Sequence, residues 1–115
     1  IDDYRIWFEK DDKFETEDED LKYTLKWLIP NSQKNEMEPI IITLKSGGKY
    51  KEEKPHEGEE FGYVLEGELT LVIADKEMTC KKGDSFYFAA DKVHYIKNTS
   101  NHTAKFLWIS TPPNF

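Results

Sequence analysis

Three residues of this chain are of a type and spacing that could hold a metal ion. His56 and Glu60 are four positions apart, and His94 lies further along. Two imidazoles and one carboxylate form a donor set that holds zinc, iron or manganese and leaves positions open for water or a substrate. From the residues alone, a metal site stays open beside a plainer interpretation, because an acidic protein often carries histidines on its surface.

The stretch 48–67, GKYKEEKPHEGEEFGYVLEG, has to position two of these groups. Side chains alternate between the two faces of a strand, so even spacing predicts that Lys54, His56 and Glu60 point the same way. Gly62 would follow on that face and leave room above it. The opposite face would be apolar, with Phe61, Tyr63 and Leu65.

The third group comes from a second stretch, residues 83–98, GDSFYFAADKVHYIKN. By the same parity, His94 and Asn98 share a strand face. Asn98 is expected to order the strand or the surroundings of the site rather than to bind a metal.

The rest of the chain reads as short strands between turns. Runs rich in β-branched and aromatic residues lie between breakers, and no window shows a helical period over a dozen residues. We expect a hairpin at Glu66-Gly67, a strand over YRIWF (residues 4–8), and a solvated connection over the acidic run 15–20. The predicted fold is all-β, a single small antiparallel β-barrel or jelly roll. Further strands are expected over residues 22–29, 37–45, 77–81, 85–90, 94–98 and 104–110, and two more lie within residues 60–74, one on either side of the Glu66-Gly67 turn.

Composition limits the classes of function. The chain has 115 residues, enough for one domain, and a formal net charge of -7 with no basic run that could neutralise phosphates, so we expect no direct nucleic-acid binding. No apolar run reaches the roughly 20 residues of a membrane span, and the N-terminus lacks a signal-peptide pattern, which indicates a cytoplasmic protein. Cys80 is the only cysteine and is expected to be a strand residue.

The two stretches resemble the motifs of the cupins, a family of small β-barrels. The first motif falls on Gly48, His56, Glu60 and Gly67, with Lys54 at the position of its first histidine. The second motif falls on three residues, Gly83, His94 and Asn98, while Ala89 and Asp91 replace its proline and glycine. The resemblance implies one cupin domain over residues 1–115, with its motifs at 48–98. It also implies that His56, Glu60 and His94 bind a divalent ion, zinc, iron, manganese or nickel.

Lys54 decides how far this metal prediction holds. An ammonium group has no lone pair for an ion. Two arrangements are therefore open: a three-ligand site with Lys54 turned to solvent, or a metal-free pocket in which Lys54 pairs with Glu60.

A narrower resemblance is to the C-terminal sensor domain of bacterial helix-turn-helix regulators of the xenobiotic-response-element type, carried by HEGEEFGYVLEGELTL, GDSFYF and WISTPPNF. It implies a homodimeric domain that binds a small effector inside the barrel, while DNA is bound by an N-terminal domain that this chain lacks. The start at Ile1 rather than methionine agrees with an excised domain. The residues expected to bind the ligand are Lys54, Gly62, Tyr63, Phe88 and Asn98.

Two other functions stay open. One is a small metal-dependent enzyme, an oxygenase or isomerase, although Lys54 and the lack of a further acid or base in the motifs favour a binding domain. The other is a freestanding storage or interaction cupin. An acidic cluster is expected to be a solvated face, or to favour a cationic effector such as an amine; it comprises Glu52, Glu53, Glu57 and Glu59.

Overall fold

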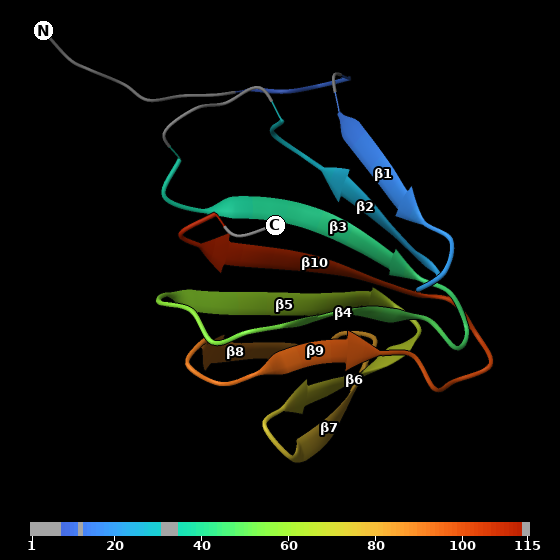
Figure 1. The fold of residues 1–115 in the computed structure, drawn as a ribbon. Coiled ribbons are helices and arrows are strands. Elements are labelled where there is room, and N and C mark those ends of the chain that lie inside the picture. Colours follow the sequence, from blue (N-terminus) through green and yellow to red (C-terminus); the bar gives the residue numbers. More distant parts are fainter. Residues whose placement is uncertain (1–7, 12, 31–34, 114–115) are drawn as a thin grey trace, which may run out of the picture.

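The computed structural model describes residues 8–11, 13–30 and 35–113, which form ten strands and no helix. The strands build two antiparallel sheets that lie against each other as a jelly roll (Figure 1). The six-stranded sheet has the order β1 (Phe14–Asp18), β2 (Tyr23–Trp27), β3 (Glu38–Leu44), β10 (Ala104–Thr111), β5 (Glu59–Glu66), β8 (Ser85–Ala89). The four-stranded sheet has the order β4 (Lys49–Glu53), β9 (His94–Lys97), β6 (Glu68–Ile73), β7 (Lys76–Lys81). The predicted all-β fold is confirmed.

The hydrophobic core lies between the two sheets. Along β10 every second side chain is buried, beginning at Ala104, because successive side chains point to opposite faces. β3 shows the same alternation. The largest fully buried apolar side chains include Ile40, Ile42, Leu44, Leu69, Leu71, Ile96, Phe106 and Trp108. Cys80 lies in β7 and packs into this core, as expected for a strand residue.

Two local predictions are wrong. Glu66-Gly67 is not the turn of a hairpin, because β5 belongs to the six-stranded sheet and β6 to the four-stranded one. Gly67, with a φ of +71°, turns the chain from one sheet to the other. The acidic run is not only a connection, since its first four residues lie in β1 and pair with β2. Of the strand expected over YRIWF, all but Phe8 lies outside the described residues.

A β-bulge in β4 sets the position of the candidate site. Tyr50 pairs with Ile96 of β9, and the next paired residues are Glu53 and His94, so three steps along β4 match two along β9. The extra residue reverses the alternation of side chains beyond it. Glu53 is therefore buried, whereas Glu52 and Lys54 are exposed.

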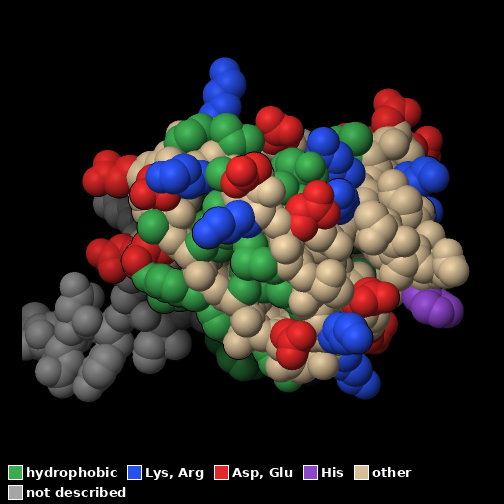
Figure 2. Space-filling model, turned by 90° about the horizontal axis from the view of Figure 1, so that it is seen from below, with side chains coloured by type: hydrophobic (Ala, Val, Ile, Leu, Met, Phe, Trp, Pro, Cys, Tyr) green, Lys and Arg blue, Asp and Glu red, His purple; other side chains and the backbone are tan. Residues whose placement is uncertain are grey.

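The described surface is charged and mixed. On the face seen from below in Figure 2, basic side chains are interspersed with acidic ones. No helix long and apolar enough to cross a membrane occurs within the described ranges.

Candidate metal centre

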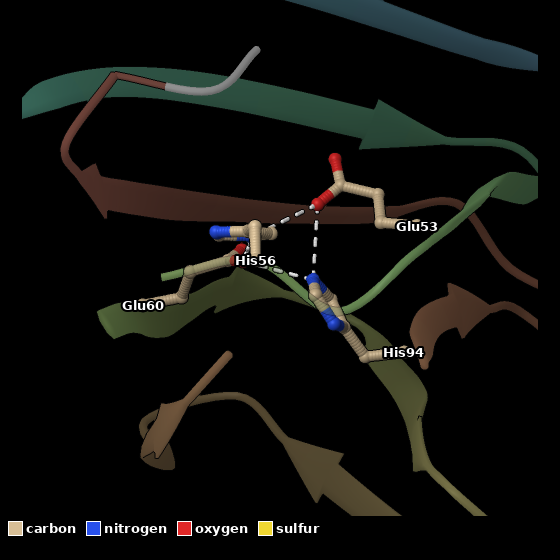
Figure 3. Close-up of side chains that lie close together, drawn as sticks. All are labelled: Glu53, His56, Glu60 and His94. Atoms are coloured by element: carbon tan, nitrogen blue, oxygen red, sulfur yellow. Dashed lines mark hydrogen bonds and ion pairs between the residues drawn. The ribbon is translucent and has the colours of Figure 1, made fainter. Parts of the chain in front are cut away.

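Four side chains converge at one end of the space between the sheets: Glu53, His56, Glu60 and His94 (Figure 3). One ligand atom from each lies within 4.8 Å of the other three. Nε2 of His94 lies 2.9 Å from Oε2 of Glu53 and 2.8 Å from Oε2 of Glu60. Nε2 of His56 lies 2.9 Å from the same Glu60 oxygen and 3.7 Å from the Glu53 oxygen. The group is a ring of alternating imidazole nitrogens and carboxylate oxygens.

The loop between β4 and β5 places His56. The backbone N–H of His56 donates to the carbonyl of Ala90, at 2.7 Å, and the N–H of Ala90 donates to the carbonyl of Gly58, at 3.0 Å. Gly58 has a φ of +120°, and a Cβ there would lie 2.0 Å from the Thr111 carbonyl oxygen. Glycine is thus needed for the close approach that holds this loop against β10.

Trp108 orients Glu60. Its indole Nε1–H donates to Oε1 of Glu60 at 2.5 Å, from β10 to the neighbouring strand β5. Both side chains are about 1% exposed. Because one carboxylate oxygen is held by the indole, the other is left facing the two imidazoles. Trp108 is not among the predicted site residues, because an indole on an alternating strand belongs to no motif and is most simply a core or interface residue.

The backbone sets the orientation of both imidazoles. Nδ1 of His94 lies 2.8 Å from the carbonyl of Lys92, and Nδ1 of His56 lies 3.1 Å from the carbonyl of Glu57. A carbonyl only accepts, so each Nδ1 carries a proton and donates it. Each Nε2 therefore points into the cluster, in the orientation that a metal-binding histidine needs.

In the absence of an ion, His94 holds a proton tightly. Burial lowers the pKa of His94, but hydrogen bonds to Glu53, Glu60 and the Lys92 carbonyl outweigh it and raise the pKa from 6.5 to about 10. The two carboxylates thus need a positive charge between them, and either an imidazolium proton or a metal ion can provide it.

The donor set fits a divalent metal ion. Two atoms that each lie about 2.0–2.2 Å from an ion at a right angle are about 3 Å apart. The closest nitrogen–oxygen separations here are 2.8 and 2.9 Å. Imidazole with carboxylate suits manganese, iron and zinc. The three predicted ligands lie together, and Glu53 joins them although the sequence pattern assigned it to a solvated cluster.

The prediction that Lys54, His56 and Glu60 share one strand face is wrong. Lys54 is exposed, because β4 ends at Glu53 and the bulge precedes it. Glu60 contacts the two histidines and Trp108. Of the two arrangements left open for Lys54, the side chain adopts the one turned to solvent.

The other predicted ligand-binding residues are not brought together. Phe88 packs edge-on against His94, with ring centroids 5.1 Å apart, and so lies beside the cluster. Gly62 faces the interior, but the ring of Phe86 fills the space above it, since a Cβ would lie 2.1 Å from that ring. Tyr63 lies on the outer face of β5, opposite to Glu60.

Asn98 lies beyond the far end of β9 from His94. Its side chain donates to the carbonyls of Leu44 and His102 and accepts from the N–H of Ser100. Asn98 therefore orders the turn that leads into β10.

Comparison with known proteins places these residues in a family. Residues 40–110 match the family model described as "Cupin domain". The chain is 32% identical over 89 residues to the HTH-type transcriptional regulator PuuR of Escherichia coli, a match that covers 76% of this chain. It spans about half the length of that regulator, 48%.

Solved structures share the fold. The cupin domain of an XRE family transcriptional regulator from Enterobacter cloacae superposes with a TM-score of 0.71 at 28% identity, covering 80% of this chain and 98% of that one. The crystal structure of FeII HppE has a TM-score of 0.78 at 21% identity, with 96% of this chain and 62% of that one covered, and it shows a likeness of fold alone. With its motifs, its jelly roll and the matching family model, this chain belongs to the cupin family and is related to the cupin domains of XRE-type regulators.

Proposed function

We propose that the chain is the effector-sensing cupin domain of a bacterial, cytoplasmic transcriptional regulator. The observation that carries the proposal is the similarity to PuuR, over 76% of the chain, and to the cupin domain of an XRE family regulator, over 80% of the chain. DNA would be bound by an N-terminal helical domain encoded upstream of Ile1, and not by this acidic segment.

A divalent ion held by His56, Glu60 and His94 would form part of the effector site. When bound, the ion would supply a Lewis-acidic point for an oxygen or nitrogen atom of the effector. Trp108 holds Glu60 in place for this role, and Phe88 covers one side of His94 with an apolar wall. His56 keeps part of its side chain, 18%, exposed, so the cluster is reachable from the loop side.

Regulation would act through a dimer. The outer face of the six-stranded sheet carries an apolar row in which Leu107 is the partner of Tyr63, and Ile109 the partner of Phe61. Tyr87 continues the row on β8. An apolar sheet face of this kind suits a second copy of the chain. An effector that binds one arrangement of the dimer better than another would shift the population and change the spacing of two tethered DNA-binding domains.

The charges near the loop favour a cationic effector, such as an amine. Glu52, Glu57 and Glu59 are exposed and flank His56 along the chain. Charges of one sign that lie close together raise the local concentration of ligands of the other sign.

A small-molecule screen tests the sensing role. The chain would be melted with and without a divalent ion in the presence of amines, carboxylates and sugars. Saturable stabilisation by one chemical class, lost in His94→Gln, supports the proposal. A coding sequence that starts immediately before Ile1, with no helical domain upstream, would count against it.

The alternative is a small metal-dependent oxygenase or isomerase. Two imidazoles beside carboxylates, the donor set of such enzymes, are the observation that favours it. Multiple turnovers of a screened substrate by the metal-loaded chain would favour the enzyme over the sensor.

A further inference from the structure

We propose that Glu53 is a fourth metal ligand and takes the place that the motif gives to Lys54. The inference rests on the proposed metal-bearing sensor site and adds a residue and a metal preference to it. The first motif has a histidine at the position of Lys54, and the side chain at that position is exposed. The ligand position has therefore moved back by one residue.

The bulge in β4 is the structural cause of this move. Without the extra residue between Tyr50 and Glu53, parity would turn residues 52 and 54 inward, with Tyr50. With it, Glu53 lies opposite His94 in the strand register and is 8% exposed. Bulges occur next to functional sites, where they re-aim one side chain.

The contacts of Glu53 suit a ligand better than a purely structural ion pair. Its Oε2 is directed at the point that both imidazole Nε2 atoms and Glu60 Oε2 surround (Figure 3). A residue that served only to pair with His94 would not need a position within 4.8 Å of the other two ligand atoms as well. A buried carboxylate also needs a compensating positive charge, which the ion supplies.

The second carboxylate changes the net charge of the metal centre and the metal ion that the centre prefers. Two carboxylates cancel the charge of a divalent ion, whereas one carboxylate with three imidazoles would leave one positive charge. Carboxylate ligands suit manganese, and imidazoles suit zinc, copper and nickel. Relative to a three-imidazole centre, this site should favour manganese over zinc.

Matched variants at two adjacent positions test the inference. The chain is stripped of metal with a chelator and titrated with Mn²⁺ alone and with Zn²⁺ alone, and the Co²⁺ form is followed by its d–d absorption. The variants are Glu53→Gln, Glu53→His, Lys54→His, Lys54→Ala and His94→Gln. Circular dichroism and metal-free melting report whether each variant folds.

The expected result separates the two positions. Glu53→Gln should weaken Mn²⁺ binding by at least about tenfold, the lower end of the cost of losing even an outer-shell partner, and should shift the Co²⁺ spectrum. Glu53→His should move the preference toward Zn²⁺. The same histidine at Lys54, and the alanine there, should leave affinity and spectrum unchanged.

Three outcomes would overturn the inference. If His94→Gln abolishes binding but Glu53→Gln binds as wild type, Glu53 is not a ligand, while the metal site of the proposed function stands. If Lys54→His changes the Co²⁺ spectrum and Glu53→His does not, the ligand position is that of the motif. If the wild type binds neither ion, the inference and the proposed metal site fall together, and only the sensing role remains. If Glu53→Gln does not fold, Glu53→His decides alone, because it keeps a ligand at that position.

Discussion

Glu53 and His94 are opposite partners in the β4–β9 register, and their side chains meet at 2.9 Å between Oε2 and Nε2. The pair joins the two motif stretches across the four-stranded sheet. It also gives the metal-free protein an ion pair that a metal ion would replace.

The stability of the metal-free chain should fall as the pH rises. The pKa of His94 is about 10 in the folded state and 6.5 as its usual value, so the folded state binds the proton more tightly. The stabilisation is fully present below pH 6.5 and is lost as the pH rises through 10. Melting temperatures of the chelated protein should therefore decline across this window. His94→Gln should show a shallower decline, since Cys80 and the buried tyrosines, whose pKa values burial also raises, still contribute to it. An equally steep decline in the variant would contradict the assignment.

Replacing Trp108 with phenylalanine should impair both folding and metal binding. The change removes the donor to Glu60 Oε1 and leaves a buried carboxylate oxygen without that bond, a cost of about 1–3 kcal/mol. Metal affinity should fall about 10–100-fold, as for other outer-shell partners. Phe106→Leu is the control, because Phe106 is equally buried and is not bonded to Glu60. It should lower stability without lowering metal affinity, and equal losses of affinity in both variants would refute the orienting role.

Gly58→Ala should displace the loop that carries His56. A Cβ there meets the Thr111 carbonyl oxygen at 2.0 Å, and the φ of +120° is strained for any other residue. Gly83→Ala is a matched control, since Gly83 also has a positive φ, +92°, but nothing lies within 4 Å of its Cβ. Denaturant unfolding should show a loss of about 1–3 kcal/mol for the control from strain alone. The loss for Gly58→Ala should be larger and accompanied by weaker metal binding; similar losses would show that the close approach is unimportant.

Tyr63→Glu should dissociate the proposed dimer. Tyr63 is 39% exposed in the apolar row of the six-stranded sheet, and a charge there would be buried unpaired between two copies. Met78 is 41% exposed, but it lies on β7 of the other sheet, so Met78→Glu should leave the dimer intact. Light scattering after size exclusion gives both masses. A dimer that survives Tyr63→Glu would place the interface elsewhere.

Much of the fold follows from local patterns. Alternation of apolar residues locates β3, β5 and β10, because each has one face in the core and one outside. The pairing of strands does not follow. Whether Gly67 closes a hairpin or moves the chain to the other sheet depends on contacts with distant strands.

The motifs predict three residues of the candidate site, His56, Glu60 and His94. They do not predict Glu53. Parity holds only along an unbroken ladder, and one extra residue in β4 reverses it. No glycine or proline lies between Gly48 and Pro55 to indicate a bulge in this strand. From the sequence, Glu53 therefore looks like any exposed acidic residue. Trp108 is missed for another reason: its hydrogen bond to Glu60 depends on β10 lying beside β5.

Metal-anomalous diffraction from crystals grown with Mn²⁺ tests the central claim most directly. We predict one strong peak, about 2.0–2.3 Å from Nε2 of His56, Nε2 of His94 and carboxylate oxygens of Glu60 and Glu53. If no anomalous peak lies among these four side chains, the claim that they form a metal centre is contradicted, whether or not manganese is bound elsewhere in the crystal.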